Sequence, residues 1–378
     1  MKLRLLAVAV ALSFVPAALA EPGSADGPGD VDARAYLVAD GRDGESLLTR
    51  NARERVPIAS ITKLMTVLLA LERSRPDEVV TVAPYRAGAG ESLIRLRSGE
   101  QLTVSELIEA SLIQSANDAA WALAAHIGRG DVNRFVELMN RRARQLGLRD
   151  THFVRPDGLD VPGHVSSARD VTELARVAMR KPLVRELVDE KTATIAGGRR
   201  LHTWNDLLYS FPGVVGVKTG HTRGAGWSQV AAARGPGVTV YATLLGGPSR
   251  GERNADLAAL LRWGLERFRV VPLVRALHTY ARAETPYDRG TIDLVAPRPV
   301  LYAARVGRRL VERVTAPAVV ELPVERGERL GEVRIFDRGR LVARSPLVAA
   351  RSVSSPGPLG RAGWYAEETF KNIGGWFR

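Results

Sequence analysis

Helix-like and strand-like patterns of apolar residues alternate through most of this chain. Three stretches carry apolar positions at helical spacing and predict helices: residues 61–73, 104–113 and 118–127. The apolar run 214–217 follows a Pro-Gly turn and predicts the start of a strand. Because such runs alternate from residue 33 to residue 268, we expect an α/β fold there, with helices flanking an antiparallel sheet and a helical subdomain beside it.

The pattern changes beyond residue 268. Short β-branched segments between turns fill residues 270–351, and Asp337-Arg338-Gly339 lies between two of them. This spacing predicts a hairpin. The segment is expected to form a small C-terminal β-domain.

Residues 359–378 predict an amphipathic helix at the end of the chain. One side of the helical wheel gathers its apolar residues: Leu359, Ala362, Tyr365, Ala366, Phe370, Ile373, Trp376 and Phe377. The other side holds Arg361, Glu367, Glu368, Lys371 and Arg378. Interfacial aromatics favour contact with a membrane surface. Docking on the β-domain is the alternative, because Gly374 and Gly375 weaken the helix and its charge is nearly balanced.

Residues 1–20 predict a signal peptide. Lys2 and Arg4 precede an apolar run, and Ala18-Leu19-Ala20 has the small residues that signal peptidase needs. The mature chain would begin at Glu21, with residues 21–32 as a flexible leader rich in Gly, Pro and Asp. We therefore expect an exported protein of the periplasm or the outer face of the cytoplasmic membrane, an uncleaved N-terminal anchor being the alternative.

Composition narrows the possible chemistry. The chain has 378 residues, 45% of them hydrophobic, and no Cys, so stability must come from a core without disulfides. The six His show no H-E-x-x-H pairing, which argues against a metal hydrolase, and no cofactor is expected. The net charge of +13 is spread over scattered Arg residues, so anionic wall polymers or lipid headgroups are better candidate partners than nucleic acid. The alternative, which the scatter favours, is a solvated arginine-rich surface without a specific partner.

Three short motifs occur in a fixed order along the chain. They are Ser60-Ile61-Thr62-Lys63, Ser115-Ala116-Asn117 and Lys218-Thr219-Gly220. An S-x-x-K motif alone is weak, because Ser and Lys are common and Ser60 could simply cap a helix beside a solvated Lys63. The ordered set of S-x-x-K, S-x-N and K-T-G is specific to serine acyl-transfer enzymes.

The spacing and sequence context of these residues predict their chemical roles. Lys63 follows Ser60 by three residues, which puts both side chains on one side of a helical turn and makes Lys63 the candidate base. Burial, the helix N-terminus and a second cation at Lys218 would each lower the pKa of Lys63. Gly220 leaves room for a ligand to approach the backbone.

Further segments extend the pattern from about residue 33 to residue 268. They include Val56-Pro57-Ile58-Ala59-Ser60, Thr151-His152-Phe153, Ser166-Ser167-Ala168-Arg169-Asp170, Lys218-Thr219-Gly220-His221-Thr222 and Gly246-Gly247-Pro248-Ser249 with Arg253. Together they resemble the low-molecular-mass penicillin-binding proteins, the serine-type D-alanyl-D-alanine carboxypeptidases. The resemblance implies that family's fold, including the small C-terminal β-domain. It also implies peptidoglycan stem peptides as substrates and β-lactams as acylating inhibitors.

The resemblance also implies a role for each matching residue. Ser60 would attack the D-Ala-D-Ala carbonyl, Lys63 would take its proton, and Ser115 would relay a proton to the leaving D-alanine. The implied substrate-binding residues are Asn117, Lys218, Thr219, Gly220, His221 and Arg253. The backbone N–H groups of Ser60 and His221 would form the oxyanion hole. The alternative is that Arg253 is a solvated surface arginine without a role in binding.

Two positions depart from the family pattern, and two other functions share part of it. Ala116 replaces a common Gly, and Thr203-Trp204-Asn205 stands where a second Asn is usual. A serine β-lactamase shares the three motifs but needs a deacylating carboxylate, for which no E-x-x-x-N or E-x-x-L-N element is found before Lys218. A catalytically silent wall-binding or antibiotic-sensing module would not need the intact nucleophile, base and carboxylate clamp.

Overall fold

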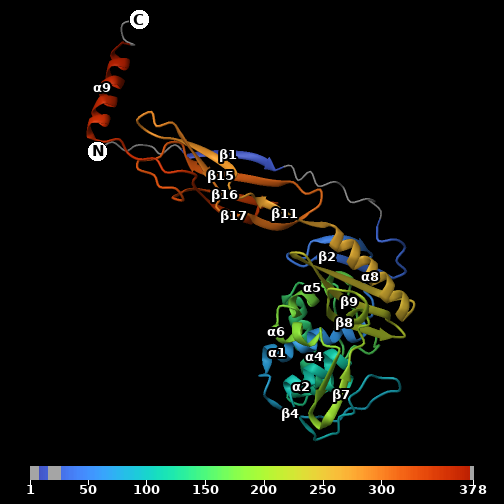
Figure 1. Ribbon diagram of the computed structural model, residues 1–378. Helices are drawn as coiled ribbons and strands as arrows, with labels where there is room; N and C mark the ends of the chain where they lie inside the picture. The colour runs from blue at the N-terminus through green and yellow to red at the C-terminus, as the bar shows by residue number, and fades with distance from the viewer. Residues whose placement is uncertain (1–7, 16–26, 375–378) are drawn as a thin grey trace. The chain divides into compact units, whose positions relative to one another are not determined.

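A computed structural model describes residues 8–15 and 27–374 of the chain (Figure 1). The chain divides into two compact units, one of residues Ser24–Arg267 and one that combines Met1–Gly23 with Phe268–Arg378. We call them the α/β-unit and the β-unit, and describe each by itself.

The α/β-unit is built on a five-stranded antiparallel sheet. Its strands are β2 (Ala35–Asp40), β3 (Ser46–Arg50), β8 (Val214–Thr222), β9 (Gly226–Gly235) and β10 (Val238–Gly247). Their order is β3-β2-β10-β9-β8, so β8 lies at one edge with its K-T-G segment inside the strand. The predicted strand start after Gly213 is confirmed.

Helices cover both faces of this sheet. Side chains alternate between the faces of a strand, and Val38 and Val240 point toward α8 (Arg250–Glu266). A Cβ on Gly264 of α8 would lie 2.8 Å from Val38 and 2.7 Å from Val240, so only glycine allows this close packing. On the other face, Thr172 of α5 (Ala168–Ala178) hydrogen-bonds Thr243 of β10 at 2.7 Å. The predicted sheet flanked by helices is confirmed.

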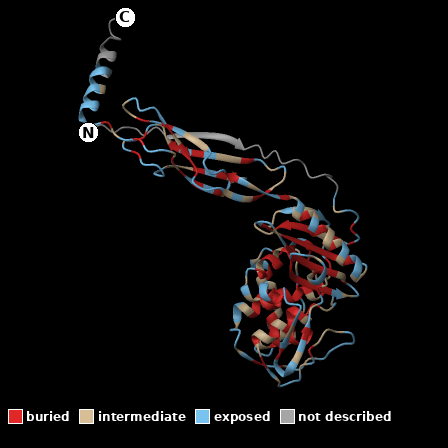
Figure 2. Ribbon diagram, viewed as in Figure 1, coloured by how far each residue is buried: buried red, intermediate tan, exposed pale blue. Residues whose placement is uncertain are grey.

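A helical subdomain lies beside the sheet. Its helices are α1 (Lys63–Arg73), α2 (Val104–Glu109), α3 (Asn117–Ile127), α4 (Val132–Gln145) and α6 (Pro182–Leu187), with a short α7 (Leu207–Ser210) before β8. It also contains three short helical turns, η1 (Ala59–Thr62), η2 (Ala110–Gln114) and η3 (Ala196–Gly198). Two antiparallel strand pairs complete it: β4 (Val79–Thr81) with β5 (Gln101–Thr103), and β6 (Thr192–Ile195) with β7 (Arg199–His202). Buried residues concentrate in the sheet and around α1 (Figure 2). Lys63 begins α1 inside this core.

The β-unit contains a six-stranded sheet and a two-stranded sheet. The first has the order β1 (Val8–Val15), β15 (Leu310–Pro317), β16 (Arg329–Asp337), β17 (Arg340–Ala349), β13 (Thr291–Val295), β12 (Thr279–Glu284). The second pairs β11 (Phe268–Val274) with β14 (Val300–Arg305). Asp337 pairs with Arg340 across a two-residue turn, in which Arg338 and Gly339 both have positive φ, 48° and 80°. The predicted hairpin is confirmed, with the turn geometry that hairpins favour.

Part of the apolar run of the predicted signal peptide forms β1. Residues Val8–Val15 pair antiparallel with β15 from Val8 opposite Pro317 to Val15 opposite Leu310. The other residues of the predicted signal peptide, its cleavage site before Glu21 and residues 21–26 of the predicted leader lie outside the described residues. Cleavage therefore stays a prediction.

The predicted C-terminal helix is α9 (Pro358–Gly374). Trp364 donates a hydrogen bond to Asp288 at 3.1 Å, and its ring meets Tyr287 edge-on with 5.3 Å between centroids. Tyr365 is 56% exposed and Leu359 is 90% exposed, so much of the apolar side stays uncovered. The predicted positions Trp376, Phe377 and Arg378 lie outside the described residues.

Candidate active site

Ser60 and Lys63 meet where η1 runs into α1. The 3₁₀ turn of η1 carries Ser60, and Ala59 before it has a φ of 48°, a left-handed conformation that turns the chain into the helix. Lys63 is fully buried, and its Nζ lies 2.7 Å from the Ser60 Oγ. With a neutral amine this hydrogen bond reverses, so that the Ser60 hydroxyl donates to Nζ. The pair is therefore arranged for proton transfer from Ser60 to Lys63.

Two further acceptors surround the Lys63 ammonium. Nζ donates to the Asn117 Oδ1 at 2.6 Å and to the Asp157 carbonyl oxygen at 2.8 Å. Burial lowers the pKa of Lys63 to about 8, while the negative charges of Asp157 and Glu91 oppose this shift. The neutral amine that a general base requires is therefore a minor but accessible form of Lys63 near physiological pH.

Ser115 and Lys218 form a second pair in the same cleft. Ser115 follows the π-helical turn η2 and adopts the left-handed conformation, with φ 61° and ψ 31°. Lys218 of β8 donates to the Ser115 Oγ at 2.8 Å. Burial first, then the nearby charges of Lys63 and Arg253, hold the pKa of Lys218 well below its usual value. The predicted repulsion between the two lysines thus acts on Lys218, whereas burial dominates the pKa of Lys63.

The edge strand β8 brings the rest of the K-T-G segment to the nucleophile. A Cβ on Gly220 would lie 2.8 Å from the Ile58 carbonyl oxygen and 3.2 Å from the Ser60 backbone nitrogen. Only glycine lets β8 approach η1 this closely. Thr219 and His221 both line the cleft, and the His221 ring stacks on Trp227 with 3.9 Å between centroids.

Arg253 is a cleft residue with a buried side chain. It is 2% exposed, so the alternative of a solvated surface arginine is wrong. Its guanidinium donates to Asn254 Oδ1 at 2.6 Å and lies 3.5 Å from the Asp206 carboxylate. Burial lowers its pKa to about 10, so Arg253 remains a cation at neutral pH and is suited to bind a carboxylate.

These residues enclose one cleft of about 390 Å³. The structure brings together in its wall most of the predicted site residues: Ser60, Ser115, Asn117, Thr219, Gly220, His221 and Arg253. Lys63 and Lys218 lie behind this wall, each hydrogen-bonded to one of its serines. A larger depression of about 730 Å³, lined by Arg53 and Arg169 among others, contains none of the predicted residues.

Sequence reasoning missed several residues of the cleft. Glu91 and Arg250 also line it, and Asp157 lies behind it with no exposed side-chain surface. Arg155 binds the two Asp157 carboxylate oxygens at 2.7 Å each. Burial would raise the pKa of Asp157, but the hydrogen bonds from Arg155 and the charge of Lys63 hold it below its usual value. The one sequence signal for Glu91 was its position directly after Gly90.

The two departures from the family pattern affect different parts of the site. Trp204 lines the cleft and donates from its indole nitrogen to the Gln114 carbonyl oxygen at 2.9 Å. Asn205 is buried instead, and accepts from Gln229 at 2.7 Å. Ala116, the middle residue of the second motif, is fully buried. Trp204 is thus the departure that shapes the cleft wall.

Comparison with known proteins decides the family. A model of the D-alanyl-D-alanine carboxypeptidases matches residues 21–249. This chain belongs to the D-alanyl-D-alanine carboxypeptidase family. It is 32% identical to D-alanyl-D-alanine carboxypeptidase DacD of Escherichia coli, covering 89% of this chain and 91% of that protein. It is 29% identical to the DacF enzyme of Bacillus subtilis, with 92% of each chain covered.

Two solved structures of penicillin-binding proteins have a similar fold. Penicillin-binding protein 6B of Escherichia coli has a TM-score of 0.63 at 30% identity, covering 85% of this chain and 97% of that one. Penicillin-binding protein 5 of Haemophilus influenzae has a TM-score of 0.62 at 27% identity, covering 87% of this chain and all of that one. The predicted fold and the predicted serine D,D-carboxypeptidase are confirmed. None of the described helices of this family member is long and apolar enough to cross a bilayer.

Proposed function

We propose that the chain removes the terminal D-alanine from peptidoglycan pentapeptide stems through an acyl-enzyme on Ser60. The observation that carries this proposal is the pair of short contacts in one cleft, Lys63 to Ser60 at 2.7 Å and Lys218 to Ser115 at 2.8 Å. One lysine–serine pair suits the attack, and the other suits the departure of the leaving group.

In the acylation step, neutral Lys63 takes the proton as the Ser60 Oγ bonds to the penultimate D-alanine carbonyl carbon. The backbone N–H groups of Ser60 and His221 hold the resulting oxyanion. The peptide C–N bond then breaks, and the leaving nitrogen receives a proton from the Ser115 hydroxyl. The Lys63 ammonium restores a proton to the Ser115 Oγ, which Lys218 holds at 2.8 Å, so the net transfer is one proton from Ser60 to D-alanine.

In the deacylation step, a water oxygen bonds to the ester carbonyl carbon and gives a proton to Lys63. The ester bond to Ser60 breaks, and Lys63 returns the proton to the Ser60 Oγ. The products are the shortened stem peptide and free enzyme. Asn117 holds the substrate amide throughout, with its side chain fixed against Lys63 at 2.6 Å.

A cationic end of the cleft binds the substrate carboxylate. Lys218 and Thr219 supply hydrogen-bond donors there, and Arg253 supplies a positive charge that is buried and poorly screened. β-Lactams acylate Ser60 as substrate mimics, since their carboxylate meets the same groups. Related proteins include penicillin-binding protein D2 from Listeria monocytogenes, whose solved structures hold cefotaxime or ampicillin.

Export and surface attachment complete the proposal. The N-terminal sequence pattern supports cleavage after Ala20 and a location in the periplasm or on the outer face of the cytoplasmic membrane. The exposed apolar side chains of Leu359 and Tyr365 support contact of α9 with a membrane surface.

The experiment compares two substrates. Purified protein is given a pentapeptide ending in D-Ala-D-Ala and the same peptide with an amidated C-terminus, and released D-alanine is measured. The free carboxylate is expected to react much faster, because the cationic end of the cleft needs an anion to bind. Equal rates would remove that role, and release by a Ser60→Ala variant would overturn the acyl-enzyme.

A further inference from the structure

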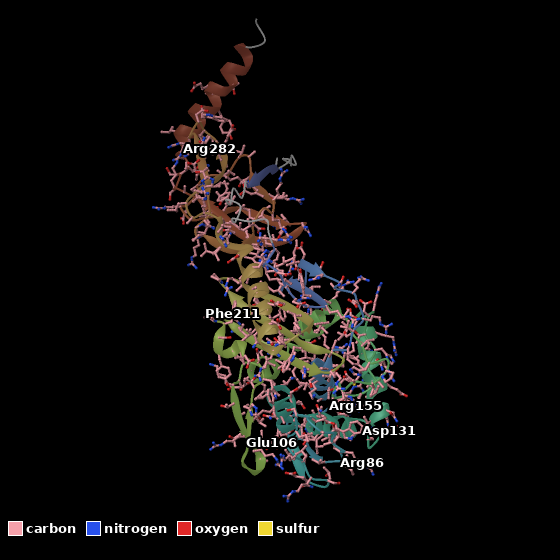
Figure 3. All side chains as sticks on the ribbon, turned by 90° about the vertical axis from the view of Figure 1, so that its right-hand side faces the viewer. Arg86, Glu106, Asp131, Arg155, Phe211 and Arg282 are labelled. Atoms are coloured by element: carbon pink, nitrogen blue, oxygen red, sulfur yellow. The ribbon has the colours of Figure 1, made fainter. Side chains whose placement is uncertain are left out.

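Glu91 is a carboxylate in the cleft wall to which the proposed mechanism gives no role. It lies on the loop between β4 and β5, which also carries Arg86 (Figure 3). Oε1 accepts from the Gly88 backbone N–H at 2.6 Å. Oε2 accepts from the Asn117 side-chain amide at 2.8 Å and from the Tyr85 hydroxyl. Three donors thus hold Glu91 in one place.

The Asn117 amide joins Glu91 to Lys63. Its Oδ1 accepts from the Lys63 Nζ at 2.6 Å, and its Nδ2 donates to the Glu91 Oε2 at 2.8 Å. The two ends of an amide have nearly the same shape, so packing alone cannot decide which end faces which neighbour. A cation on one side and a carboxylate on the other leave one favourable orientation. One Nδ2 hydrogen stays available for a substrate carbonyl.

The second carboxylate near Lys63 is held differently. Asp157 forms a salt bridge with Arg155 at 2.7 Å, whereas Glu91 forms no salt bridge with any residue in the described part of the chain. The negative charge of Glu91 is therefore less neutralised where it faces the lysine. Tyr85 lies between the two carboxylates, with its ring 5.6 Å from that of Trp121 and its hydroxyl 3.4 Å from Asp157.

We propose that Glu91 is a positioning residue, which fixes the Asn117 amide and through it aligns Lys63 with Ser60 for acylation. This inference rests on the proposed role of Lys63 as the base. The charge of Glu91 also favours the Lys63 ammonium and so opposes the lowering of the Lys63 pKa by burial. The charged groups that act on Lys63 or lie beside it are Asp157, Glu91, Asp118, Arg155 and Lys218.

The test measures the second-order rate of acylation by a fluorescent penicillin as a function of pH. In Glu91→Gln, Asn117 and Gly88 compete for the one remaining acceptor oxygen, so the rate is expected to fall about 10-fold to 100-fold. Loss of the negative charge should also move the acid limb of the profile to lower pH. A merely structural role for the loop would lower the rate and leave the limb in place.

Three further variants make the result specific. Glu91→Asp keeps the charge but withdraws it from Asn117, so its rate should fall while its limb moves less than in Glu91→Gln. Tyr85→Phe removes one donor and keeps the carboxylate, so it should have the smallest loss. Glu137→Gln, on an exposed position of α4, is the matched control and should behave as wild type. Melting temperatures establish that each variant is folded.

The outcomes separate this inference from the proposed function. An acylated wild type with a Glu91→Gln variant of unchanged rate, or of lower rate with an unmoved limb, would overturn the positioning role alone. If Glu91→Gln does not fold, Glu91→Asp decides, and a wild-type rate there would overturn the role. A wild type that is not acylated would overturn the proposed function first.

Discussion

The pH dependence of acylation follows from the burial of Lys63. The proposed mechanism needs Lys63 as a neutral amine, and burial lowers its pKa from 10.5 to about 8. The fraction of neutral Lys63 increases as pH rises. Because burial lowers the pKa, the neutral amine becomes the main form just above pH 8. The rate of acylation should therefore rise with pH and level off near pH 8 to 9.

The size of the effect follows from the shift. At pH 7 a lysine of pKa about 8 is neutral in about 1 molecule in 11, against about 1 in 3,000 at 10.5, an advantage of about 300-fold. The rate should rise about 50-fold between pH 6 and pH 8. The burial also costs stability of roughly 3 kcal/mol at neutral pH, a cost that fades as pH rises from about 8 toward 10.5.

The assay is stopped-flow or quenched labelling with a fluorescent penicillin between pH 5.5 and pH 10, under conditions where the rate is proportional to penicillin concentration. Such a rate reports the free enzyme. A limb centred near pH 10, or a flat profile, would refute the argument that burial activates Lys63. Lys63→Arg serves as the control, because a guanidinium remains charged and should abolish acylation over the whole range.

Two further substitutions and one truncation test other parts of the site and the tail. Gly220→Ala should lower the rate of acylation by about 100-fold, because its Cβ would lie 2.8 Å from the Ile58 carbonyl oxygen. The control is Gly251→Ala, whose Cβ would have only one atom within 4 Å. Equal acylation rates for the two variants would exclude the close approach of β8 to η1. Arg253→Gln should lower kcat/KM for the pentapeptide about 10-fold to 100-fold through loss of a charged hydrogen bond, and an unchanged kcat/KM would exclude carboxylate binding by Arg253. A chain ending at Ser354 should lose liposome co-sedimentation and keep soluble peptidase activity; a loss of activity instead would favour a helix docked on the β-unit.

Local sequence signals were sufficient for much of the fold and for the reacting groups. The turn before Val214 and the two-residue turn at Arg338-Gly339 depend on residues close in sequence, so both could be predicted. The residues within each of the three motifs are also close in sequence, so their relative positions depend on local structure. Ser60 and Lys63 meet within one helical turn, and this contact needs no tertiary information.

The rest of the site depends on contacts between distant segments. Glu91 reaches Asn117 across 26 residues, and Lys63 reaches the Asp157 carbonyl across 94. No periodicity encodes such contacts. The sequence left open whether Arg253 binds substrate or is a solvated surface residue, because its partner Asp206 lies 47 positions away. The left-handed conformation of Ser115 follows a π-helical turn, and the pattern of residues 104–114 predicts only a regular helix there.

Intact-protein mass spectrometry after exposure to benzylpenicillin tests the central claim most directly. The account predicts one covalent adduct with the full mass of the antibiotic, located on Ser60 by peptide mapping, and no adduct in Ser60→Ala. The variant should fold like the wild type, because Ser60 lies at the cleft surface. An unmodified wild type, or an adduct that persists in Ser60→Ala, would contradict the account.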